Sequence, residues 1–303
     1  MGSDTLTKML GLGEPQLLDD NGAEITEGPL WHPEGYLTYI RLRESELVRW
    51  DEKDGVQVIR RNTGNGNGCT FDAEGRFVMC HFGDRNVTRT ERDGSINVIA
   101  ETFNGVPLNQ PNDIVLHNNG DLYFTDPFWS LPVEDRHLGY NAVFRLHPDG
   151  SLDLATDECE FPNGLAFSPD QSVLYVGITR RDQDCIKEME NDGRCPHRYL
   201  RAFDVAPDGS LSNNRIFFDM SDSPDPGWID GLKVDVDGRI FCTGPGGVWV
   251  ISPEGELLGL IGFSDVARNL AFGGPDLSTM YVTAGGSLYS VTTKTRGIPA
   301  YPV

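Results

Sequence analysis

Six carboxylate or amide side chains stand at equivalent positions of a repeated sequence pattern. In each copy the polar residue precedes an alternating apolar segment, a turn and a second apolar segment. The leading residues are Glu27, Asn67, Asn112, Asn163, Asp230 and Asn269. A lone Asn-Gly pair is typical of a turn, because both residues adopt a positive φ at little cost. Six copies of the pattern need another explanation. One is metal binding, because carboxylate and amide oxygens are the ligands that hard divalent cations prefer.

The elements that must position these residues follow from the spacing of the copies. Successive copies begin 39 to 67 residues apart, close on average to the length of a four-stranded propeller blade. Turn sequences such as "HPDG" and "APDG" separate further short β-rich segments within the repeats. The sequence therefore predicts an all-β fold, a single domain over residues 1–303 that forms a six-bladed β-propeller with four antiparallel strands per blade.

The last repeat is shorter than the others. After Asn269 only about three strands fit before the chain ends. The N-terminal segment 14–20 resembles the outer strands of other blades, so we expect it to supply the missing strand. Such an N-terminal strand would close the ring and remove an exposed sheet edge.

Propeller geometry predicts where the leading residues and the loops lie. The first strand of each blade lines the central channel, so the six leading residues should form a ring at one face. The loops between second and third strands return to that face, and the longest, 127–140 and 178–198, should wall a pocket over the ring. Asp72, at a hairpin turn of the opposite face, is explained by turn formation.

Two residues near the first long loop have open interpretations. Asp126 either contacts a substrate or transfers a proton, or it caps the loop that follows it. Trp129 either stacks on a ring-shaped substrate or packs within the loop.

A divalent cation would neutralise the negative charge of the ring. Glu27 and Asp230 bring two negative charges together without a cationic side chain beside them in these motifs, which is costly in a bare channel. Asn163 and Asn112 would add neutral oxygens. All-oxygen ligation makes Ca²⁺ the first choice, with Mg²⁺, Mn²⁺, zinc or iron as alternatives. The competing interpretation is that these residues cap strands and bind channel water.

Composition restricts the partners. The 46 Asp and Glu residues against 25 Lys and Arg give a net charge of −21, which argues against nucleic acid and anionic membranes as partners. The chain start lacks the apolar core of a signal peptide, so we expect a cytoplasmic protein that acts on a small molecule. Cys185 and Cys195 lie ten residues apart in a polar loop and could form a disulfide or stay reduced.

Several motifs in order resemble one family. They are "EGPLW", "NGCTFD", "NQPNDIVLHNNGDLYFTDP", "FPNGLAFSPD" and "WIDGLKVDVDGRIF". Over residues 27–284 the chain resembles the SMP-30/gluconolactonase/luciferin-regenerating family of six-bladed propellers, which includes regucalcin, bacterial sugar lactonases and the related diisopropylfluorophosphatase. The resemblance implies that the metal is held by a Glu, an Asn and an Asp, which fall on Glu27, Asn163 and Asp230.

The resemblance also implies a substrate pocket beside the metal. Asn112 falls on a position of the pocket or the metal shell. Regucalcin-like members carry an Arg two residues before it as a sugar-binding group, whereas this chain has Gln110. We therefore assign Gln110 to the pocket, although it lacks the paired N–H donors of a guanidinium group.

The implied activity is metal-dependent hydrolysis of a lactone, foremost a sugar lactone such as an aldonolactone, to the hydroxy acid. The cation would polarise the lactone carbonyl, and Asp230 would act as base or as nucleophile. Asn112 and Asn67 would orient the substrate through amide hydrogen bonds. The alternatives are a phosphotriester or organofluorophosphate hydrolase at the same site, and a non-catalytic propeller that binds a metal or ligand. Strictosidine-synthase-like propellers do not require this metal triad, which counts against them.

Overall fold

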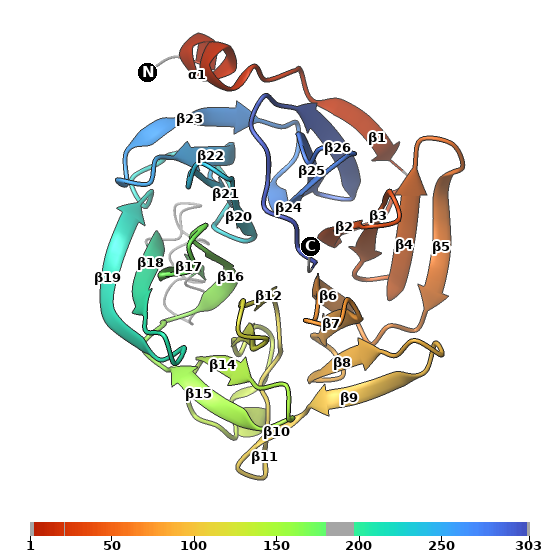
Figure 1. Cartoon of the computed structure of the whole chain (residues 1–303), viewed down its shortest axis with the longest axis vertical. Coiled ribbons are helices and arrows are strands. Elements are labelled where there is room, and N and C mark those ends of the chain that lie inside the picture. Colours follow the sequence, from red (N-terminus) through yellow and green to blue (C-terminus); the bar gives the residue numbers. More distant parts are fainter. Residues whose placement is uncertain (1–2, 21, 180–196, 302–303) are drawn as a thin grey trace.

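The computed structural model describes residues 3–20, 22–179 and 197–301 of the chain. Six four-stranded antiparallel sheets surround a central axis as the blades of a propeller (Figure 1). The predicted all-β, six-bladed fold is confirmed. Among the described residues, helix is confined to α1 (Ser3–Leu10) and a short 3₁₀ turn, η1 (Val133–Asp135).

The first three blades follow one another along the chain, each from its inner to its outer strand. Blade 1 contains β2 (Thr26–His32), β3 (Tyr36–Arg41), β4 (Glu46–Asp51) and β5 (Gly55–Arg61). Blade 2 contains β6 (Gly66–Phe71), β7 (Phe77–His81), β8 (Asn86–Thr90) and β9 (Ile96–Ala100). A small hairpin of β10 (Thr102–Phe103) and β11 (Val106–Pro107) leads to blade 3, with β12 (Ile114–Leu116), β13 (Leu122–Asp126), β14 (Ala142–Leu146) and β15 (Leu152–Thr156).

The last three blades repeat this order, except that the sixth takes its outer strand from the N-terminus. Blade 4 contains β16 (Pro162–Phe167), β17 (Val173–Thr179), β18 (Arg198–Val205) and β19 (Leu211–Asp219). Blade 5 contains β20 (Leu232–Val234), β21 (Ile240–Gly244), β22 (Gly247–Ile251) and β23 (Leu257–Gly262). Blade 6 contains β24 (Ala267–Gly273), β25 (Thr279–Ala284), β26 (Ser287–Thr292) and β1 (Gln16–Asp20).

Apolar side chains fill the spaces between neighbouring blades. Val78 of blade 2 packs with Phe124 and Phe144 of blade 3, and Tyr39 of blade 1 packs with Tyr281 of blade 6. Because each sheet is covered on both faces, the inner strands β6 and β16 are buried at every residue, whereas the outer strand β5 alternates between partly buried and exposed positions. The core of the fold is therefore distributed among the blade interfaces.

The N-terminal strand closes the ring as predicted. β1 pairs antiparallel with β26, with Gln16 opposite Ser290 and Leu17 opposite Tyr289. The preceding helix α1 lies outside the ring next to β23 (Figure 1), where its buried Leu6 packs beside Gly259. Hydrogen bonds between the first and last strands thus hold the two ends of the ring together.

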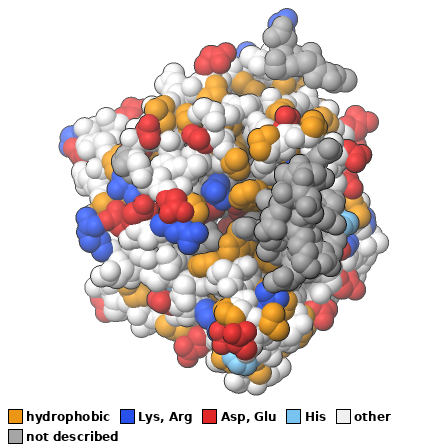
Figure 2. All heavy atoms as spheres, turned by 180° about the vertical axis from the view of Figure 1, so that it is seen from behind, with side chains coloured by type: hydrophobic (Ala, Val, Ile, Leu, Met, Phe, Trp, Pro, Cys, Tyr) orange, Lys and Arg blue, Asp and Glu red, His pale blue; other side chains and the backbone are white. Residues whose placement is uncertain are grey.

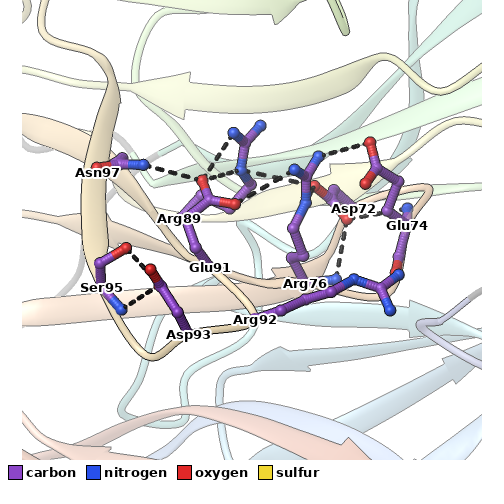
Figure 3. Close-up of polar contacts among 9 residues, drawn as sticks. All are labelled: Asp72, Glu74, Arg76, Arg89, Glu91, Arg92, Asp93, Ser95 and Asn97. Carbon is purple, nitrogen blue, oxygen red and sulfur yellow. Dashed lines mark hydrogen bonds and ion pairs between the residues drawn. The ribbon is translucent and has the colours of Figure 1, made fainter.

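The hairpin turn of blade 2 has the turn chemistry that the sequence predicts for Asp72. Its Oδ1 accepts hydrogen bonds from the backbone N–H groups of Glu74 and Arg76, both at 2.9 Å, and Oδ2 pairs with Arg76 Nε at 2.8 Å (Figure 3). Arg76 and Arg89 also both reach the carboxylate of Glu91, at 3.3 and 2.8 Å. These charges stabilise a turn, so no ligand is needed to explain Asp72.

The C-terminal segment after β26 was not predicted. Its described part returns towards the axis of the ring (Figure 1). Backbone hydrogen bonds fix it, from Val236 N to Arg296 O and from Gly297 N to Leu277 O, both at 2.9 Å. The Thr295 hydroxyl also donates to Asp235 Oδ2 at 2.8 Å. These contacts place residues 295–297 against blades 5 and 6.

Some predictions fall outside the part of the chain that is described. These are the proposed bridge between Cys185 and Cys195 and most of the loop 178–198. Cys69, Cys80 and Cys242 lie buried as free thiols in strands, as the sequence indicates. No helix within the described ranges is long and apolar enough to cross a membrane.

Gly164 offers a test of the contact between inner strands. A β-carbon built on Gly164 would lie 2.8 Å from Gly231 Cα, whereas one on Gly262 meets nothing closer than 4.0 Å. Gly164→Ala should therefore lower the free energy of unfolding by about 1–3 kcal/mol. Gly262→Ala, the matched control, should change it little. Urea denaturation of both variants measures this, and equal effects would contradict the close approach.

Candidate active site

The six leading residues of the repeats lie where the inner strands begin. Glu27, Asn67, Asn163 and Asn269 lie within β2, β6, β16 and β24, and Asn112 and Asp230 lie two residues before β12 and β20. Backbone hydrogen bonds join neighbouring blades at this level, from Gly68 N to Asn112 O at 2.7 Å and from Gly164 N to Asp230 O at 3.0 Å. All six side chains are buried. The strand entrances are thus drawn together around the axis.

A small cavity of about 40 Å³ lies between them. Its walls contain Glu27, Asn67, Asn112, Trp129, Asp230 and Arg268, together with Ile25, Leu42, Arg43 and Phe82. Five of the predicted site residues therefore share one cavity. Gln110, Asp126 and Asn163 are not among the lining residues.

The two carboxylates in the cavity repel each other. Burial raises the pKa of Asp230 to about 6; Arg268 opposes this shift and Asp113 adds to it. Burial, followed by repulsion from Asp230, raises the pKa of Glu27 well above its usual range. Both carboxyl groups are thus destabilised in their charged forms, as expected for like charges held in a poorly solvated site.

The sequence analysis missed two charged residues of this site. Arg268, directly before Asn269, lines the cavity and lowers the pKa of both carboxyl groups. The expectation that the ring has no cation beside it was therefore wrong. Asp113 is buried next to Asn112 and adds a third negative charge. It occupies the place that Gly takes after four of the six leading residues, and this departure was the available signal.

The side-chain oxygen of Asn163 is buried and accepts no hydrogen bond. Its Nδ2 donates to Thr179 Oγ1 at 3.4 Å, and its amide forms a hydrogen bond with Asp230 that lowers the pKa of that carboxyl. Its Oδ1 is buried without a hydrogen-bond partner, which is costly unless a ligand supplies one. Two carboxylates and this amide oxygen fit a hard cation. Within the described ranges, no group of three or more His, Cys, Asp and Glu side chains is suited to hold a metal.

Gln110 holds the loop that carries Trp129. Its Oε1 accepts a hydrogen bond from Ser130 N at 2.7 Å, and its Nε2 donates to Ser130 Oγ at 3.2 Å. Trp129 has a positive φ of 32° and packs near Phe161, with ring centroids 5.5 Å apart. Gln110 therefore holds the loop whose Trp129 forms part of the cavity wall. A contact between Gln110 and the substrate stays a prediction.

Asp126 is buried beneath the same loop. Its Oδ2 accepts a hydrogen bond from Asn109 N at 2.8 Å, and Asn109 Nδ2 donates to the backbone oxygens of Asp126 and Tyr140 at 2.9 and 3.0 Å. Burial raises the pKa of Asp126 to about 7, although hydrogen bonds from Asn109 and Gln110 oppose the shift. These contacts favour the interpretation that Asp126 organises the segment before Asn112.

A buried arginine organises the approach to Asp230. Arg198 is 1 % exposed, and its guanidinium donates to the backbone oxygens of Ser221, Ser223 and Gly227 at 3.1, 2.8 and 3.0 Å. These carbonyls belong to the loop that leads to Asp230. Sequence alone gave no sign of this role, because Arg198 follows a long loop and its partners are backbone atoms.

The surface around the channel carries charges of both signs. On the face turned away from the viewer in Figure 1, basic and acidic side chains are intermixed with apolar ones over the described surface (Figure 2). Arg43, which lines the cavity, pairs with Glu24 at 3.7 Å. The net charge of −21 is therefore not gathered into one acidic patch on the described part of this face.

Comparison with known sequences identifies the family. The family described as the SMP-30/Gluconolactonase/LRE-like region matches residues 25–286. The chain belongs to this family. Its relatives include a gluconolactonase from Zymomonas mobilis, 29% identical over 97% of this chain and 86% of that protein. A pentonolactonase from Haloferax volcanii is 26% identical over 88% of this chain and 84% of that protein.

Solved structures of the family have the same fold. A gluconolactonase from Xanthomonas campestris superimposes with a TM-score of 0.79 and is 32% identical, covering 92% of this chain and 89% of that one. The family match and this related structure therefore confirm the resemblance that the motifs indicated.

The titration of Asp126 predicts a pH dependence of stability. Its pKa of about 7 in the folded protein exceeds the value of about 4 in an unfolded chain. The stabilisation that its proton provides is complete below about pH 4 and is lost as the pH rises through 7. The isosteric variant Asp126→Asn should therefore gain about 2–4 kcal/mol of unfolding free energy relative to wild type between pH 4 and pH 8. Urea titrations at both pH values measure the difference, and parallel pH profiles would rule out this titration.

Proposed function

We propose that this chain hydrolyses a sugar lactone to the hydroxy acid at the cavity between Glu27 and Asp230, whose volume of about 40 Å³ suits a divalent cation and the reacting carbonyl group. Two buried carboxyl groups of raised pKa share this cavity, and this observation carries the proposal. The lactonase class is supported by the gluconolactonase and pentonolactonase relatives, which align over most of the chain.

Glu27, Asp230 and the unpartnered Oδ1 of Asn163 are the atoms suited to hold the cation. Ca²⁺ is the first choice because the donors are all oxygen, with Mg²⁺, Mn²⁺, zinc or iron as alternatives. When bound, the cation would act as a Lewis acid that polarises the lactone carbonyl. Arg268 offsets part of the negative charge in the cavity, so the site remains suited to one divalent cation.

The protein's own groups have separable roles in this proposal. Asp230 takes the proton of the attacking water or attacks the carbonyl itself. Asn67 and Asn112 donate amide hydrogen bonds to substrate oxygens, since both line the cavity. Trp129 and Phe82 form an apolar part of its wall that limits the access of bulk water. Gln110 and Asp126 support the wall and the segment before Asn112 through the hydrogen bonds described above.

A substrate panel tests the reaction. Purified protein should release acid from aldonolactones such as glucono-δ-lactone. Titration at constant pH measures the rate of acid release, from which the rate of spontaneous hydrolysis is subtracted. Turnover of phosphotriesters but not of lactones would contradict the proposal and favour a phosphotriester or organofluorophosphate hydrolase. Absence of turnover on both, with a cation still bound, would mean a binding propeller.

Isosteric substitutions test the carboxylates. Glu27→Gln and Asp230→Asn each remove one negative charge from the cavity with little change of shape, and each should lower kcat at least about 100-fold. Asn269→Ala is the control from the same ring, because Asn269 does not line the cavity and its Oδ1 accepts a hydrogen bond from Leu270 N at 2.8 Å. It should keep most of the activity. Equal effects of the three changes would disprove the assigned roles.

Removal of metal tests the cation independently of activity. Treatment with a chelator should abolish hydrolysis and lower Tm, and added Ca²⁺ should restore both, because a ligand that binds only the folded state stabilises it. In Asn163→Ala the gain in Tm at a given Ca²⁺ concentration should be smaller. Hydrolysis that persists after exhaustive chelation, together with an unchanged Tm, would exclude the cation.

A further inference from the structure

The opposite mouth of the central channel contains a larger cavity. It has a volume of about 530 Å³, in the range of pockets that take small organic ligands. Later residues of the same inner strands form its wall, among them Leu30, Leu116, Leu165 and Phe272. Ile298 and Tyr301 of the C-terminal segment complete it. We call this space the rear cavity.

The described residues that line the rear cavity include one lysine and no Asp or Glu. Lys233 of β20 lines it, and neither Asp nor Glu occurs among the lining residues, although the chain has 46 of them. Lys233 Nζ donates to the carbonyl of Leu232 at 3.0 Å, and it has no carboxylate partner within the described ranges. In the hairpin turns of blades 2 and 5, by contrast, Arg76 and Arg239 are each paired with an Asp at 2.8 Å.

The segment that closes the rear cavity is fixed. Gly297 N donates to Leu277 O, Val236 N donates to Arg296 O, and Tyr301 packs edge-on against Phe71 with ring centroids 6.1 Å apart. The cavity is therefore a preformed space with a mostly apolar wall, one ammonium group and a few polar side chains, among them Thr70, His117 and Gln171.

We propose that the rear cavity binds a small amphipathic monocarboxylate, whose carboxylate pairs with Lys233 Nζ and whose apolar body contacts Leu30, Leu165 and Phe272. A single ammonium group with no acidic neighbour among the described lining residues matches one negative charge. The leucine and phenylalanine surfaces match a hydrocarbon or aromatic body. The rear cavity and the cavity between Glu27 and Asp230 share no lining residue. The site is thus separate from the lactonase cavity and does not rest on the proposed function.

Calorimetric titration with octanoate tests the proposal. Octanoate should bind the full chain with one saturable site, and the neutral analogue octanamide should bind at least about tenfold more weakly, since a hydrogen bond to a charged group is lost. Lys233→Met keeps the apolar stem and should weaken octanoate binding at least about tenfold. Lys53→Met is the matched control, because Lys53 is exposed and lies outside the rear cavity; it should bind as wild type does.

Two further variants keep the test decisive. Ile298→Glu adds a negative charge at an exposed position of the wall and should weaken octanoate binding even if Lys233→Met fails to fold. Asp230→Asn should bind octanoate as wild type does, because Asp230 lies at the other mouth of the channel. No saturable binding to wild type, unchanged binding to Lys233→Met, or loss of binding only in Asp230→Asn would each overturn the proposal.

Discussion

The close approach of consecutive inner strands determines what happens at the axis. Where Gly164 and Gly231 follow Asn163 and Asp230, a β-carbon would collide with the next blade, and the glycine N–H groups donate instead to carbonyls of that blade. Each contact fixes the side chain of the residue before the glycine at the channel. In the four copies in which Gly follows the leading residue, blade packing therefore requires the glycine, whereas an isolated Asn-Gly pair would be a turn.

The packing contact has an electrostatic consequence. Glu27 and Asp230 belong to different blades, and both are held at strand entrances that the neighbouring blades cover. Neither carboxylate can move into solvent to relieve the repulsion without breaking contacts between blades. Arg268 offsets only part of the charge, and Asn163 adds an acceptor without a partner. Burial and mutual repulsion disfavour the charged forms of both carboxyl groups, and a bound dication would stabilise those charges, which is the physical reason for proposing a cation.

The repeat made most of the fold and part of the site predictable. Its spacing gave six blades, and the shortened last repeat indicated closure by residues 14–20, because both depend on local patterns. The cavity shared by Glu27 and Asp230 followed from symmetry. Arg268 and the contacts of Gln110 did not follow, because the direction of a side chain depends on tertiary neighbours. The return of residues 293–301 to the axis has no repeat signal, since it occurs once.

The two mouths of the channel differ although the same strands build both. At the entrances of the strands, polar side chains line a cavity of about 40 Å³, and a few residues further along, mostly apolar side chains surround about 530 Å³. At four of the six strand entrances, glycine lets the backbones of neighbouring blades approach closely. The residue types along the inner strands thus separate a confined polar site from a larger, mostly apolar one. Chemistry that needs fixed charges belongs at the first mouth, and recognition of apolar surface belongs at the second.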